Sequence, residues 1–169
     1  MKKGSALFAL AICVADVALA SPPRSKLPGV GGVLFGTTLA AAQKKLGAGV
    51  KLDTDPTNPK IKILLSRSKN FYGDSFAVNY TFGKAGRFTE AYLIANIKPG
   101  DYAPCRQHWN GVISKLEEAY GRPDTEEKDL DGAIQSHSTE FKFADGASLE
   151  ASLLGCLLMI HASSSNAVK

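Results

Sequence analysis

The sequence has few of the residues and motifs that mark an enzyme, a metal protein or a disulfide-rich scaffold. Its 169 residues include three cysteines, three histidines and one tryptophan. It contains no C-x-x-C, and the histidines show no zinc-ligand spacing. It also lacks the glycine-rich signatures G-x-x-x-x-G-K-[ST] and G-x-G-x-x-G that bind phosphates and dinucleotides. We therefore predict a protein without a metal or a cofactor.

The polar residues do not form a recognisable catalytic set. Nucleophilic catalysis needs a Ser or Cys beside an oriented base. Serines flank His137 in "SHS", but on a strand they point away from it, so His137 is better interpreted as a half-buried packing residue. His108 and His161 are interpreted as a helix-rim residue and a structural or exposed residue. The carboxylates in "EEKDLD" are typical of a solvated charge run. We predict a protein that is not an enzyme, and a small hydrolase with no recognisable motif is the third alternative.

The first twenty residues have the pattern of an export signal. Lys2 and Lys3 precede the short apolar stretch "ALFALAICV", and "ALA" before Ser21 fits the small-x-small cleavage rule. The apolar stretch is shorter than the roughly 20 residues that a membrane span needs. We predict cleavage near Ala20/Ser21 and a periplasmic or secreted mature protein. An uncleaved N-terminal anchor is the alternative.

Two cysteines, Cys105 and Cys156, remain after removal of residues 1–20. In an oxidising compartment, a pair of cysteines predicts one disulfide. Closing a loop of this length stabilises the fold by roughly 4 kcal/mol in the chain-entropy treatment. Two buried free thiols are the alternative.

The charge is distributed unevenly along the chain. Residues 21–99 hold twelve Lys or Arg against four Asp or Glu, a net charge of +8, and residues 100–169 hold six against eleven, a net charge of −5. Such a bipolar molecule has a field that can orient an encounter with a partner, although two solvated faces that happen to differ are the simpler interpretation. Export and the modest total charge argue against nucleic-acid binding.

The remaining 149 residues suit a single domain. We predict a flexible Pro/Gly leader at 21–32, one domain at 33–163 and a disordered tail at 164–169. A short helix is expected in "FGTTLAAAQKKLG", with Thr37 or Thr38 as the N-cap and Gly47 at its end. A longer helix is expected from Cys105 to about Tyr120, with a buried stripe of Cys105, Trp109, Val112 and Leu116.

Two segments of the chain show the same order of elements. "YTFGKAGRF" and "FKFADGASL" each predict a strand, a turn and a strand, and each follows a helix that stops at glycine. The economical arrangement is an antiparallel sheet with helices on one face. We therefore predict an α+β fold of two helix-plus-antiparallel-sheet repeats, 33–98 and 99–163.

Two motifs carry a family resemblance. "LFGTTLAAAQKKLG" resembles the opening of small exported bacterial modules, including the β-lactamase inhibitor protein fold and the BamE (SmpA/OmlA) type of outer-membrane assembly lipoprotein. "CRQHWNGVISKLEEAYGRP" resembles a stretch of uncharacterised periplasmic proteins that have a later cysteine strand, here "CLLMI". The resemblance implies a tandem helix-plus-sheet layout, but no lipid-attachment motif is present.

The segment "SRSKNFYGDSF" is the most suggestive candidate for binding. Phe71 and Tyr72 lie between polar residues at a predicted loop tip, and exposed aromatic residues of this kind often dominate protein interfaces. The candidate partner-binding loop comprises Lys69, Asn70, Phe71, Tyr72 and Asp74. The alternative is that one or both aromatic rings fold back onto the sheet. We predict an exported, non-catalytic protein-binding module, in the form of an inhibitor or immunity-type protein that uses this loop and the open sheet face. An envelope-assembly accessory is the second hypothesis, and the identity of the protein partner is not predicted.

Overall fold

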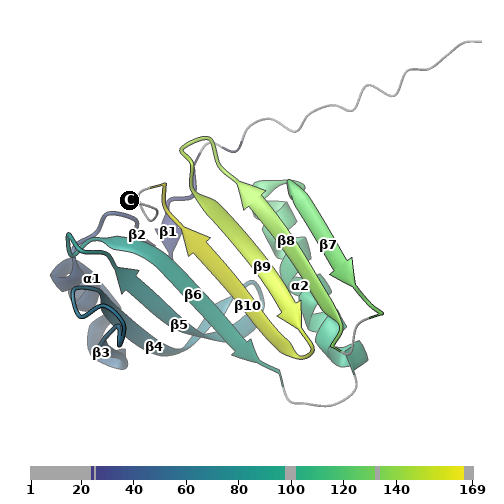
Figure 1. The fold of residues 1–169 in the computed structure, drawn as a ribbon, viewed down its shortest axis with the longest axis horizontal. Helices are drawn as coiled ribbons and strands as arrows, with labels where there is room; N and C mark the ends of the chain where they lie inside the picture. The colour runs from purple at the N-terminus through teal and green to yellow at the C-terminus, as the bar shows by residue number, and fades with distance from the viewer. Residues whose placement is uncertain (1–23, 25, 98–101, 132–133, 166–169) are drawn as a thin grey trace, which may run out of the picture.

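A computed structural model describes residues 24, 26–97, 102–131 and 134–165. The predicted export signal and most of the predicted tail lie outside these residues. Eight strands of the described chain form one antiparallel sheet in the order β3-β4-β5-β6-β10-β9-β8-β7 (Figure 1). The strands are β3 (Val50–Thr54), β4 (Lys62–Phe71), β5 (Asp74–Phe82), β6 (Phe88–Asn96), β7 (Thr125–Asp129), β8 (Ser136–Lys142), β9 (Ser148–Leu154) and β10 (Leu157–Ser163).

One face of this sheet is the core of the protein. Alternation along each central strand sends every second side chain to this inner face. Across the sheet, Tyr80 pairs with Ala91, Ala91 with Ala162, Ala162 with Leu149, and Leu149 with Phe141. All five of these residues are buried, so one continuous layer of apolar side chains runs from β5 to β8.

Two α-helices of the described chain cover the inner face. Helix α1 (Leu39–Leu46) begins at Thr38, whose side chain accepts a hydrogen bond from the Ala41 N–H, and it stops at Gly47. Helix α2 (Tyr102–Tyr120) buries Cys105, Trp109, Val112, Ile113 and Leu116. The predicted ends of α1, at Thr38 and Gly47, and the predicted buried stripe of α2 are therefore confirmed. In Figure 1 the sheet lies between the viewer and α2.

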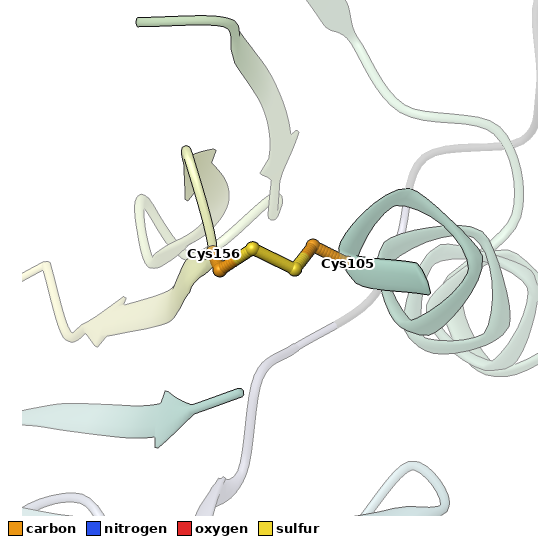
Figure 2. Close-up of a disulfide and its surroundings, with 2 residues drawn as sticks. All are labelled: Cys105 and Cys156. Carbon is orange, nitrogen blue, oxygen red and sulfur yellow. A yellow bond between two sulfur atoms is a disulfide. The ribbon is translucent and has the colours of Figure 1, made fainter. Parts of the chain in front are cut away.

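A disulfide links α2 to the sheet. Cys105 in the first turns of α2 is joined to Cys156, with the two Cα atoms 5.2 Å apart (Figure 2). The predicted pairing is confirmed, but Cys156 does not lie in a strand. It occupies the two-residue turn Gly155–Cys156 between β9 and β10. The positive φ of Gly155 at the first turn position fits the tight hairpin turns that match the twist of a sheet.

The N-terminal part of the described chain packs across the inner face, where the sequence predicts a flexible leader at 21–32. Leu27 and Val30 are buried, and β1 (Gly29–Val30) pairs with β2 (Val33–Leu34). Arg24 donates hydrogen bonds to the carbonyl oxygens of Tyr120 and Lys142 and pairs with the carboxylate of Asp124. This segment is thus a strap that crosses from the end of α2 to α1.

The predicted fold class, two helix-plus-sheet repeats of the α+β type, is wrong. The fold is β-rich: 47% of the described residues are in strands and 23% are in helices. The strands of the two expected repeats join through the β6–β10 pair into one sheet. Pairing within one sheet satisfies the backbone N–H and C=O groups of the central strands. Two separate sheets, each packed against its own helix, are therefore not needed. No strand was predicted at β3, which at the sheet edge has no buried residue to produce a clear alternating pattern.

Candidate functional site

The segment predicted as an aromatic binding loop is the tip of the β4–β5 hairpin. Lys69, Asn70 and Phe71 belong to β4, Asp74 begins β5, and only Tyr72 and Gly73 form the turn between them. Both turn residues have positive φ, 51° for Tyr72 and 90° for Gly73, as a two-residue hairpin turn of type I′ requires.

The aromatic rings at this tip pack against the core. Phe71 and Tyr72 are both half-buried, and the Phe71 ring lies edge-on to Phe76 with the ring centres 6.4 Å apart. Burial, and next a hydrogen bond to Tyr120, raises the pKa of Tyr72. Of the five predicted loop residues, Asn70 alone is exposed. A carboxylate oxygen of Asp74 lies 3.0 Å from Nδ1 of His108 in α2. The tip therefore holds the hairpin against α2, which matches the alternative in which the rings fold back.

The three histidines do not converge. His137 is buried on the inner face between the rings of Tyr102 and Trp109, and neither of its ring nitrogens has a hydrogen-bond partner among the described residues. His108 lies on the exposed side of α2. His161 points to the opposite side of the sheet from Leu158 and Ile160. In the described part of the chain, no three His, Cys, Asp or Glu residues group as a metal site would require.

The face of the sheet that carries no helix presents a central apolar patch. The patch comprises neighbouring outward-facing residues of β6, β9 and β10 and is called the open-face patch below: Tyr92, Ile94, Leu154, Leu157, Met159 and His161. The register places Tyr92 opposite His161 and Ile94 opposite Met159. Leu157 is opposite Leu154, which is 47% exposed. Contiguous apolar side chains on a solvated sheet face are typical of an interaction surface.

A stacked pair lies at one end of the open-face patch, next to the row formed by Ile94 and Met159. The rings of Tyr92 and His161 are 4.3 Å apart and nearly parallel, at 7°. Tyr92 is 40% exposed. Burial of its remaining surface, and next the charges of Glu90 and Glu150, raises its pKa. His161 Nε2 is 4.0 Å from a carboxylate oxygen of Glu90. The pair forms a flat, amphipathic platform at the surface.

Carboxylates border this platform on the β8–β9 side. Glu150 is directly opposite Glu140 in the sheet. Like charges directly opposite each other destabilise a strand pair. Lys142 reaches Glu140 at 3.2 Å, and the Ser138 hydroxyl donates to Glu150 at 3.4 Å. These contacts lessen the repulsion, yet both carboxylates stay at the surface beside an apolar patch, where a cation from another molecule can meet them.

A hollow of about 650 Å³ adjoins the end of the open face, between the β5–β6 turn and the β8–β9 turn. Its lining includes the rings of Phe35 and Phe88 and charges of both signs on Lys84, Arg87 and Asp145. Glu90 belongs both to this hollow and to the surroundings of the Tyr92–His161 pair. The hollow is therefore positioned to receive a side chain of a molecule that docks on the open-face patch.

Sequence reasoning named the open face of the sheet as a binding surface but did not identify the residues of this site. Along β8 and β9, outward-facing residues alternate with buried ones. The turn at 143–147 sets the register of the two strands. It is closed by a hydrogen bond from the Phe143 N–H to the Ala147 carbonyl oxygen. Counting outward from that turn would have placed Glu140 opposite Glu150. The pairing of β6 with β10 assembles the open-face patch. Because no turn connects these two strands directly, no local sequence pattern predicts their register.

Comparisons with known proteins give no identification: no protein-family model, no curated protein and no solved structure matches the chain. Nothing in them identifies the inhibitor or BamE type of fold. None of the described helices combines the length and the apolar character needed to cross a bilayer.

Proposed function

We propose that this chain is an exported, non-catalytic protein-binding module that docks its partner on the open-face patch. The observation that carries the proposal is the Tyr92–His161 platform beside the opposed carboxylates Glu140 and Glu150. Aromatic residues in an apolar surface patch, with charges at the border of the patch, are an arrangement that protein interfaces use. The disulfide supports the export part of the proposal, because such bonds persist in oxidising compartments.

The charges at the border indicate the chemistry of the partner. Glu90, Glu140 and Glu150 lie around the β6–β10–β9 strands that carry the patch. A partner that offers an apolar centre and Lys or Arg side chains toward these carboxylates relieves their repulsion, so it is favoured over an acidic one. The partner class we propose is an enzyme of the envelope or a secreted enzyme, with this chain acting as an inhibitor or immunity-type protein.

A matched pair of charge reversals tests the docking surface. The variant Glu140→Lys/Glu150→Lys inverts the border of the open-face patch, and Glu117→Lys/Glu118→Lys makes the same change in charge on exposed residues of α2. Immobilised mature protein would be exposed to envelope extract, and bound proteins would be quantified. We expect the open-face variant to lose at least ten-fold of the specific partner, while the helix variant retains it.

The same capture separates the inhibitor from a scaffold. An enzyme partner whose turnover falls on addition of the protein supports the inhibitor. A partner that binds with unchanged activity supports an assembly role. Equal capture by both charge variants would remove the open-face patch as the binding surface.

A further inference from the structure

A second site lies on the opposite side of the sheet, under the N-terminal strap. A partly open cavity of about 280 Å³ lies between the inner face and the residues of the β1–β2 hairpin. Its floor is formed by four buried residues of β6, β9 and β10: Leu93, Leu149, Ile160 and Ala162. Gly29, Gly31 and Gly32 of the strap and the rings of Phe71, Tyr72 and Tyr120 complete its lining.

No charged side chain lines this cavity. A charged ligand would lose its hydration without gaining an ionic partner, which is strongly unfavourable. The apolar floor therefore selects a neutral, mainly apolar molecule. An apolar cavity of about 150 Å³ holds benzene, and pockets for small ligands begin at about 300 Å³, so this cavity suits one ring with a short substituent.

Tyrosine hydroxyls give the cavity its polar character. Tyr72 and Tyr120 both line it and are hydrogen-bonded to each other. The pair has two hydroxyl protons, and their mutual bond uses one, so the other is available for an acceptor.

The hydroxyl of Tyr80 lies next to the cavity, behind Gly31, although Tyr80 is not one of the lining residues. It is buried and has no partner among the described residues. It lies so close to Gly31 that a Cβ atom there would be 2.5 Å from the oxygen, and Gly31 and Phe71 both line the cavity. A buried hydroxyl without a partner is unfavourable, and an acceptor in the cavity would satisfy it.

We propose that this cavity binds a small neutral carbonyl compound, such as an aromatic ketone or ester, whose oxygen accepts a hydrogen bond from a tyrosine hydroxyl. The apolar part of the ligand would rest on Leu149, Ile160 and Ala162. The proposal is independent of the open-face patch, because the two sites lie on opposite faces of the sheet.

Two probes of nearly equal shape test this assignment: acetophenone, which has the carbonyl, and ethylbenzene, which lacks it. Each would be titrated into the mature protein labelled at its Leu and Ile methyl groups, with binding followed by NMR. We expect the largest shifts at Leu93, Leu149 and Ile160. Acetophenone should bind about five-fold more tightly than ethylbenzene, the value expected for one hydrogen bond.

Variants separate the cavity from its hydroxyls. Ala162→Leu fills the cavity and should abolish binding of both probes, and Ala162→Val is the second blocking variant if the larger side chain prevents folding. Tyr72→Phe/Tyr120→Phe, which removes both tyrosine hydroxyls of the lining, should remove the preference for acetophenone and leave the affinity for ethylbenzene nearly unchanged. Tyr102→Phe is the matched control, since the hydroxyl of Tyr102 is also buried without a partner in the described chain but does not line this cavity.

The proposal is overturned by any of three results. These are the absence of shifts at the floor methyl groups with millimolar probe, binding that persists in a folded Ala162 variant, and equal affinity of the two probes for the wild-type protein.

Discussion

Helix α2 buries far more side chain against the sheet than helix α1 does. Five residues of α2 are buried and one is covalently attached to the β9–β10 turn, whereas Ala42 is the buried residue of α1. The start of α1 is held mainly through the backbone. The N–H groups of Gly36 and Leu39 donate to the carbonyl oxygens of Phe88 and Gly86. A long helix can thus be fixed by its side chains, while a short one depends on the chain that leads into it.

Among variants that test the difference between α1 and α2, removal of the disulfide should have the largest effect on stability. The bond closes a loop of 51 residues, so we expect Cys105→Ala/Cys156→Ala to lower the free energy of unfolding by about 4 kcal/mol. Urea unfolding measures the loss, and hydrogen exchange should place it at α2 and β7–β10 more than at α1. Reduced wild-type protein is the control and should show a similar loss. Two reactive thiols in the untreated mature protein would contradict the premise.

A smaller difference is expected from equal truncations in the two helices. Leu116 of α2 is fully buried, so Leu116→Ala should cost about 3 kcal/mol of unfolding free energy, within the range for buried leucines. Leu46 of α1 is half-buried, so Leu46→Ala should cost about 1 kcal/mol because less surface leaves the core. Thermal and urea unfolding of the two variants would be compared. Equal losses would show that α1 is packed as firmly as α2.

The smallest effect concerns His137 under α2. Burial, and next the charges of Lys128 and Arg106, lowers the pKa of His137 from its usual 6.5, against an opposing effect of Glu126. The unfolded chain therefore takes up this proton at a higher pH than the folded chain. The free energy of unfolding should fall as the pH decreases below about 6.5.

His137→Phe is the matched variant for this pH dependence, because it keeps a ring between Tyr102 and Trp109. Urea unfolding at pH 5 and pH 7 should show a smaller difference for His137→Phe than for the wild type. An identical difference in the two proteins would assign the pH dependence to other groups.

Local patterns in the sequence predict much of the difference between α1 and α2. The stripe of α2 follows from the spacing of Cys105, Trp109, Val112 and Leu116, and the ends of α1 follow from Thr38 and Gly47. These features depend on residues three or four positions apart, so the sequence alone contains them. The pairing of Cys105 with Cys156 followed from there being just two cysteines beyond the predicted signal.

The features that sequence reasoning missed depend on contacts between distant segments. The turn at Tyr72–Gly73 resembles an exposed polar loop, because nothing local shows that α2 and the strap pack against its aromatic rings. The open-face patch requires β6 beside β10, and the sequence predicts both strands without their adjacency. The edge strand β3 has no buried residue, so no buried face generates an alternating pattern there.

The central β6–β10 pair also has a kinetic consequence. Its partners, from Asn96 with Leu157 to Glu90 with Ser163, are 61 to 73 positions apart. Contacts at such separation raise the contact order and slow folding, because a large loop must close before the pairing is gained. Of the described strands, β10 is the last to be synthesised, so the sheet cannot be completed before residue 163 has emerged.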